Sequence, residues 1–220
     1  MKKIISLEDA VSKIKDGMSV MCGGFLGTGA PEAIIDEIIR QDIKDLTLII
    51  NDTSFINIGG GKLINHKLVK KVITSHIGTN PQSGLQMNAE ELEVVLVPQG
   101  TLAEQIRAAG AGLGGVLTPV GLGTLVENGK QKIFLNDKEY LIELPIKADV
   151  AIIKGYKIDH MGNILYNNSA RNMNPLMATA ADLVIAEADH IVEVGSIDPN
   201  HIVTPGLFVD YIVNGGQINE

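Results

Sequence analysis

Short apolar runs alternate with amphipathic segments along the first half of the chain. Residues 18–22 and 46–50 are short, mostly apolar runs, typical of buried strands, and 46–50 suits burial on both faces of a parallel sheet. Residues 91–98 are also predicted to form a strand. Residues 34–39 instead place isoleucines at helical spacing, which indicates an amphipathic helix. Strand, turn and helix recur in this order. The pattern therefore predicts an α/β fold with an open, mostly parallel sheet and helices on both of its faces.

The pattern changes in the second half of the chain. Residues 124–126, 132–135 and 140–144 are short strand-like segments, separated by Asn128-Gly129 and Asn136-Asp137. Such pairs favour the tight turns of β-hairpins. We therefore predict a small antiparallel meander beside the main sheet.

Core strands are predicted to resume after the meander, at residues 148–153, 183–186 and 191–194. Before it, Thr101 with Glu104 three residues later resembles a capping box, which predicts that a helix starts at Thr101. No linker-like segment divides the sequence, so we expect a single domain over residues 1–220.

Composition narrows the possible partners and compartments. The net charge is -8, whereas a nucleic-acid or anionic-membrane footprint needs clustered Lys and Arg, so neither partner is expected. One cysteine allows no internal disulfide and suits a reducing cytosol. The start of the chain lacks the apolar core of a signal peptide, and no apolar run approaches the ~18 residues of a membrane span. We expect a cytoplasmic protein. The five histidines lack metal-ligand spacing, so no metal is expected.

A glycine-rich loop follows the first buried strand. Gly23, Gly24, Gly27 and Gly29 fall within seven residues, and Pro31 then opens a helix. Glycines let backbone N–H groups approach a ligand, and a helix start adds unpaired donors and a positive dipole end. The loop is therefore predicted to hold an oxyanion. The alternative is a tight turn that only connects two elements.

Polar residues follow several of the predicted strands. Ligands of open parallel sheets bind outside the carboxyl ends of the strands, and this rule brings the glycine loop together with Asn51, His76 and Gln99. The two amides would donate to a developing oxyanion, unless they only cap loops. His76 is interpreted as a structural histidine. The candidate site residues are Gly23, Gly24, Phe25, Gly27, Asn51, Asp52, Gln99 and Gly100. This set contains no evident nucleophile, so a complete active site needs a group from outside the chain.

Several motifs, taken together, resemble one family. They are the stretch 16–31 with its glycine loop, Asn51-Asp52-Thr53, residues 75–81, residues 97–102, Gly110-Ala111-Gly112 and residues 169–172. This set resembles the family I coenzyme A transferases of alpha-subunit type, and in particular the acetate (butyrate) and acetoacetate branch with separate alpha and beta chains. The resemblance covers nearly the whole chain.

The resemblance implies an enzyme that moves CoA from an acyl-CoA to a free carboxylate. A glutamate of the beta subunit would form a CoA thioester in a ping-pong reaction, so no catalytic residue is expected in this chain. CoA would be a substrate, and no permanently bound cofactor is implied. Residues matching Asn51 and Gln99 line the site in the family, beside the glycine loop.

Two details bear on how the resemblance is applied. In the family, the beta-subunit glutamate lies in a Ser-Glu-Asn-Gly motif, and residues 126–129 of this chain read Val-Glu-Asn-Gly. The serine is absent and a hairpin turn is predicted there, so the similarity at Glu127 is interpreted as accidental. The pair Asn51-Asp52 resembles Asn-Asn in the branch of the family that uses succinyl-CoA. The Asp at position 52 departs from that pair and favours short-chain acids as substrates. The alternatives are a small-anion-binding module and a sugar-phosphate-related enzyme on the same fold, and the latter should contain its own acid and base.

Overall fold

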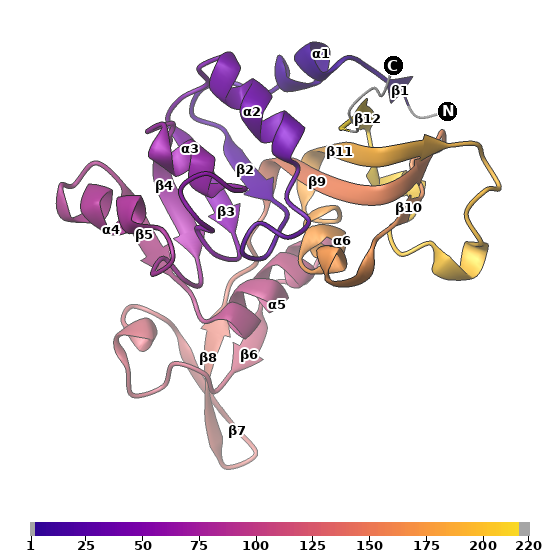
Figure 1. Ribbon diagram of the computed structural model, residues 1–220. Coiled ribbons are helices and arrows are strands. Elements are labelled where there is room, and N and C mark those ends of the chain that lie inside the picture. The colour runs from indigo at the N-terminus through magenta and orange to yellow at the C-terminus, as the bar shows by residue number, and fades with distance from the viewer. Residues whose placement is uncertain (1–2, 216–220) are drawn as a thin grey trace.

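A parallel sheet of eight strands runs through the body of the molecule (Figure 1). The computed structural model describes residues 3–215, and its strands follow the order β1-β12-β11-β9-β2-β3-β4-β5, with the short β10 antiparallel to β9. The strands of this sheet are β1 (Lys3–Ile4), β2 (Ser19–Cys22), β3 (Leu46–Ile50), β4 (Val69–Thr74), β5 (Glu93–Leu96), β9 (Ala148–Asp159), β10 (Ile164–Leu165), β11 (Ala181–Val192) and β12 (Tyr211–Asn214).

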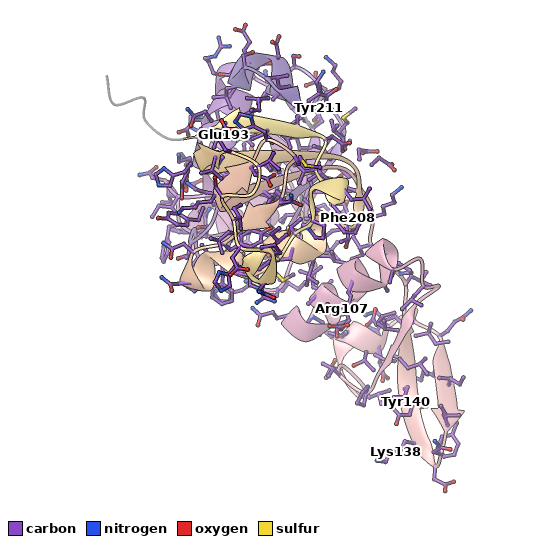
Figure 2. The ribbon with its side chains drawn as sticks, turned by 90° about the vertical axis from the view of Figure 1, so that its right-hand side faces the viewer. Arg107, Lys138, Tyr140, Glu193, Phe208 and Tyr211 are labelled. Atoms are coloured by element: carbon purple, nitrogen blue, oxygen red, sulfur yellow. The ribbon has the colours of Figure 1, made fainter. Side chains whose placement is uncertain are left out.

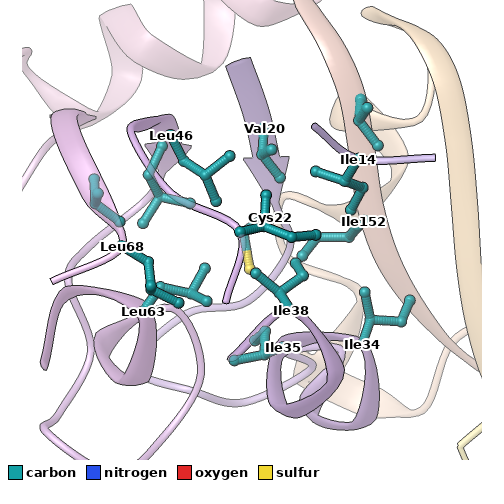
Figure 3. Close-up of a cluster of buried hydrophobic side chains, with 14 of the residues drawn as sticks. Ile14, Val20, Cys22, Ile34, Ile35, Ile38, Leu46, Leu63, Leu68 and Ile152 are labelled. Atoms are coloured by element: carbon teal, nitrogen blue, oxygen red, sulfur yellow. The ribbon is translucent and has the colours of Figure 1, made fainter. Parts of the chain in front are cut away.

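Helices cover both faces of the sheet. They are α1 (Leu7–Val11), α2 (Glu32–Arg40), α3 (Gly61–Asn65), α4 (Pro81–Asn88), α5 (Gln99–Gly110) and α6 (Asn174–Met177). Side chains alternate along the strands, so Val20 and Cys22 of β2 pack under α2 and α3, whereas Met21 packs with α5 and α6. Figure 3 shows Cys22 at the centre of the first of these two cores. The predicted fold class is confirmed.

One long strand replaces two predicted ones. Residues 183–186 and 191–194 were expected to form separate strands because the sequence between them is polar, but β11 runs unbroken from Ala181 to Val192. It pairs in parallel with β9 along its whole length. The polar interruption includes Glu187, which is buried against the start of α2. A long-range contact of this kind leaves no trace in local periodicity.

The predicted meander forms a separate three-stranded sheet, ordered β6-β8-β7 (Val116–Thr118, Lys138–Glu143 and Lys132–Leu135). The prediction of a strand at 124–126 is wrong, because Leu125–Glu127 is a short 3₁₀ helix in which Thr124 Oγ1 accepts from Val126 N. Residues 116–143, which we call the arm, project away from the body (Figures 1 and 2).

Helix α5 begins earlier than predicted. Its first residue is Gln99, and Thr101 lies within the first turn instead of capping it. Thr101 is 5% exposed, and its Oγ1 has no hydrogen-bond partner within residues 3–215. The two-residue shift places Gln99 on the first turn of a helix, directly beside the carboxyl ends of the strands.

Candidate functional site

The direction in which successive strands are added to the sheet reverses at β2. The chain adds β3, β4 and β5 on one side of β2 and later returns to place β9 on the other side. Crevices at such switch points are the usual ligand sites of open parallel sheets. The loop after β2, the residues after β3 and β4, and the start of α5 all lie at this edge.

A chain of hydrogen bonds joins three of the predicted residues. Gln99 Nε2 donates to Asn51 Oδ1 at 2.9 Å, and Asn51 Nδ2 donates to Asp52 Oδ2 at 2.8 Å. The carboxylate of Asp52 also accepts from Leu26 N and Ser54 N. Asp52 therefore ties the loop after β2 to the loop after β3. The expectation that Asn51 and Gln99 meet at one edge of the sheet is confirmed.

These residues surround a pocket of about 250 Å³. Its lining consists of Phe25, Leu26, Asn51, Asp52, Ser75, His76, Thr79 and Gln99. Four of the predicted site residues are in this set. Gly23, Gly24 and Gly27 support the loop behind the pocket, and Gly100 borders a different groove.

Leu26, Ser75 and Thr79 were not singled out as site residues. Ser75 follows β4 directly, so the strand-end rule could have found it. Its hydroxyl donates to the carbonyl of Asn51 at 2.6 Å, which fixes that loop. Leu26 carried no signal, because a leucine with φ of 48° is not expected from local sequence.

The glycine loop is a closed turn rather than an open row of donors. Phe25 and Thr28 exchange two backbone hydrogen bonds, and Gly24 N donates to Asn172 Oδ1. Leu26 N donates to Asp52, as described above. Most of the amides in the loop are therefore engaged within the chain. The loop brings Phe25 and Leu26 to the pocket, and its close packing explains the small residues.

Gly23 shows how closely the loop is packed. A Cβ at this position would lie 1.9 Å from Oδ1 of Asn174. Asn174 is fully buried, and its amide group binds the carbonyls of Gly29 and Ala170 and the N–H of Lys154. Glycine is required at position 23 because a buried amide occupies the space of a side chain.

The start of α2 does not supply free donors, which corrects the expectation from the sequence. Ala33 N and Ile34 N both donate to Oε2 of Glu187, at 2.9 and 3.1 Å. Glu187 is 1% exposed, and burial raises the pKa of its carboxyl, opposed by Lys154 Nζ at 3.3 Å. A carboxylate of the chain itself thus occupies the positive end of the helix dipole.

Other titratable groups do not complete an active site. Burial raises the pKa of the Cys22 thiol far above its usual range, so Cys22 acts as a small core residue. Glu127 lies in the arm, where Gly123 N and Lys132 lower its pKa, and it does not line the pocket. Within residues 3–215, no three His, Cys, Asp or Glu side chains are grouped as metal ligands. The helices of the same range include none with the length and apolarity needed to cross a bilayer.

Large apolar side chains lie exposed around the pocket. Phe25 and Leu26 are 42% and 38% exposed, and Phe55 and Ile58 of the next loop are 42% and 44% exposed. Clustered apolar exposure on a folded protein marks a surface that a partner covers. The pocket is therefore open on a side that is chemically suited to another polypeptide.

Known proteins are similar to this chain along nearly its whole length. The coenzyme A transferase family matches residues 4–215. The chain is 52% identical to acetate CoA-transferase subunit alpha of Escherichia coli K12, over 96% of each chain. It is also 52% identical to the alpha subunit of acetoacetyl-CoA:acetate/butyrate CoA transferase of Clostridium acetobutylicum, over 96% of this chain and 97% of the relative.

A solved structure shares the fold. An acyl-CoA transferase from Escherichia coli O157:H7, crystallised as a thioester complex with CoA, superposes with a TM-score of 0.84 at 22% identity. The match covers 97% of this chain and 49% of the solved chain, so this chain spans about half the length of that enzyme. On the sequence matches, the chain belongs to the coenzyme A transferase family, among its alpha-type subunits.

Proposed function

We propose that the chain is the alpha subunit of an enzyme that exchanges CoA between a short-chain acyl-CoA and a free carboxylate. The reactive glutamate would belong to a beta subunit. CoA is a substrate in this proposal, and no cofactor is held permanently. The observation that supports it is the open pocket itself, in which amide groups converge beside an exposed apolar rim.

The chemistry proceeds by displacement at a carbonyl carbon. The glutamate attacks the thioester, the C–S bond breaks, and CoA leaves as a thiolate to give an acyl-glutamyl anhydride. The thiolate then attacks the glutamyl carbonyl, which releases the acyl group as a carboxylate and leaves a glutamyl-CoA thioester. A second carboxylate reverses these steps. Each displacement passes through an oxyanion, and Gln99 Nε2 retains one N–H beyond that given to Asn51.

The nucleophile is assigned to another chain because this pocket offers none. Asp52 is its one carboxylate among the described residues, and both Asp52 oxygens already accept hydrogen bonds. Asp52 is also 3% exposed. A sugar-phosphate isomerase would need an acid and a base here, and His76 has no carboxylate within ion-pair distance in the described chain.

Covalent trapping tests the proposal. The complex of this chain with its cognate beta subunit is incubated with butyryl-CoA, digested, and searched by mass spectrometry for a peptide that carries CoA. We expect the adduct on a glutamate of the beta subunit. An adduct on this chain, for example at Glu127, would contradict the division of labour, as would turnover by this chain alone.

Gln99→Ala tests the role of the amide in the same complex. Loss of one oxyanion donor typically costs 10²- to 10³-fold in kcat. We expect a fall of about that size with unchanged assembly, whereas Gln82→Ala, outside the pocket, should leave both unchanged. A parallel loss of assembly and turnover in Gln99→Ala would indicate that the amide only holds the loop.

A further inference from the structure

The arm has one covered face and one uncovered face. Paired residues of an antiparallel sheet point to the same side, and the partners Leu141 and Thr118 lie on the side that loop 119–131 covers. Leu141 is fully buried, and a Cβ on Gly121 would lie 3.4 Å from it. Loop 119–131, which contains the short 3₁₀ helix, therefore covers this side of the arm's sheet, as helices cover the faces of the main sheet.

The opposite face is apolar, and within the described chain its base, at Leu117 and Ile142, borders α5 while the rest is uncovered. Register places Leu117 with Ile142, Ile133 with Tyr140 and Leu135 with Lys138 on this side. Three of its leucine and isoleucine side chains are well exposed, namely Leu117 at 45%, Ile133 at 38% and Leu135 at 47%. Figure 2 shows Tyr140 and Lys138 on the part of the arm that extends from the body. We call Leu117, Ile133, Leu135, Tyr140 and Ile142 the open face.

A small sheet with an apolar face in water lacks a stabilising layer. Three strands need a packed hydrophobic face for independent stability, and contiguous apolar exposure marks a contact surface. On the other side of the same strand β7, Phe134 is 70% exposed but pairs with the charged Glu139. Lys132, two residues before Phe134, adds a second charge on that side. On the open face the paired positions of β7 and β8 carry one charge, Lys138, which lies opposite Leu135 at the end of the strands.

The base of the open face lies beside the first turn of α5, the helix that carries Gln99 of the candidate site. Leu117 also lines a groove of about 360 Å³ whose other wall is Gly100, Thr101 and Glu104 of α5. Gly100 follows Gln99, the residue that donates to Asn51 in the pocket. A chain that covers the open face and fills this groove would therefore contact the first turn of α5, one residue from Gln99.

A second groove joins the same face to α5. It measures about 440 Å³ and is lined by Ile142, Gln105 and the Lys130–Glu143 ion pair, among others. Gln105 is 7% exposed, and its Oε1 has no hydrogen-bond partner within residues 3–215. A buried acceptor without a donor is costly, so this groove suits an N–H or O–H group of an incoming chain.

We propose that the open face of the arm is a docking surface for the beta subunit, with apolar side chains as the contact. The proposal rests on the proposed function, because it identifies the covering chain with the one that supplies the glutamate. Two copies of this chain packed through their open faces would bury the same residues. They would not bring a nucleophile to the pocket, however, whereas the groove at Leu117 borders Gly100, the residue next to Gln99 of the pocket.

Two aspartate variants of neighbouring residues test the docking surface. Leu135→Asp places a charge on the open face, and Phe134→Asp places one on the opposite face at a more exposed position. Binding to the cognate beta subunit is measured by sedimentation in the absence of any acyl-CoA. We expect Leu135→Asp to weaken binding at least tenfold and Phe134→Asp to change it by less than about twofold, at matched melting temperatures.

Three outcomes would overturn the proposal. One is equal weakening by both variants, and another is unchanged binding in Leu135→Asp. The third is loss of self-association of the isolated chain in Leu135→Asp with binding to the beta subunit intact, which would assign the face to a second copy. If Leu135→Asp does not fold, Ile133→Thr, which keeps a β-branched side chain in the strand, is measured instead. The binding measurement contains no substrate, so it is independent of the covalent-trapping experiment. A complex that assembles but forms no CoA adduct when butyryl-CoA is added would contradict the proposed function without contradicting the docking surface.

Discussion

Asp52 carries an unbalanced charge at the wall of the pocket. It accepts hydrogen bonds from two backbone amides and from Asn51, and no ion pair joins it to a cation among the described residues. Hydrogen bonds stabilise a carboxylate, but they do not cancel its field. A dicarboxylic acyl chain would bring a second negative charge close to the first. A monocarboxylic chain brings no second charge, and Phe25 and Leu26 offer it apolar contacts in the same pocket.

Asp52→Asn should therefore shift the choice of substrate. Like charges about 4 Å apart near a protein surface repel by several kcal/mol, so even partial relief should raise kcat/KM for succinyl-CoA relative to butyryl-CoA by at least tenfold. Initial rates of the assembled complex with both thioesters measure this ratio. The Asn side chain keeps one oxygen to accept from Leu26 N and Ser54 N, and its NH2 group requires that the Asn51 amide turn over to accept from it. Melting temperatures of the wild-type and variant complexes are therefore compared alongside the rates. An unchanged ratio would show that the charge does not select the acyl group.

Gly23→Ala should destabilise the folded chain. The added Cβ would meet the buried Asn174 amide at 1.9 Å, and the resulting displacement would cost about 2–3 kcal/mol through overpacking and weakened hydrogen bonds. Gly84→Ala is the matched control, because nothing lies within 4 Å of its Cβ position and Gly84 is inside α4. That change should stabilise by about 0.5–1 kcal/mol. Urea unfolding of both variants measures the difference, and equal effects would contradict the close packing at Gly23.

At the scale of elements, Glu187 of β11 holds the start of α2 and so sets where the glycine loop ends. Burial raises its folded-state pKa above the ordinary 4.5. Folding then favours the protonated form, so this stabilising contribution is complete below pH 4.5 and is lost as the pH rises through the folded pKa. The stability of the wild type relative to Glu187→Gln should accordingly fall as the pH rises above 4.5.

Glu37→Gln is the control with the opposite sign. Arg40 holds the pKa of Glu37 below 4.5, so ionised Glu37 stabilises above that pH, and the contribution is lost as the pH falls through the lowered pKa. Unfolding free energies over about pH 3 to 8 give both differences. Slopes of the same sign in the two variants would contradict the assignment of Glu187 as a buried, poorly solvated carboxylate.

Elements with local signals were predictable, and elements that depend on distant contacts were not. The strand at 46–50 and the strand-end positions of Asn51 and Gln99 follow from apolar runs and from the geometry of parallel sheets. The continuity of β11 depends on Glu187 meeting a helix more than 150 residues away in sequence. The strand Val116–Thr118 was not among the predicted strands; it is three residues long, glycines precede it and Pro119 follows it. Its partner β8 supplies the hydrogen bonds that define it.

The whole molecule is a body with an arm inserted between α5 and β9. The arm begins and ends at one place, because Val116 pairs with Glu143 across its base. The strands of the body form one continuous sheet without the arm, since β9 pairs with β2 and β11. Residues 117–142 form no strand pairs with the main sheet. The arm is therefore a structural addition whose stability depends on α5 and, in our proposal, on the beta subunit.

Excising the arm should leave a folded body. Asn-Gly in place of residues 117–142 would join Val116 to Glu143 by a two-residue hairpin turn. Glu143→Gln is included in the same variant, because removal of Lys130 would leave that carboxylate beside Gln105 without its cation. Calorimetry should show one cooperative transition within several degrees of the intact chain, since both cores of the sheet remain. Loss of the transition would mean that body and arm fold as one unit, which is the strict form of the single-domain prediction. A retained transition together with loss of beta-subunit binding would locate the contact in the arm.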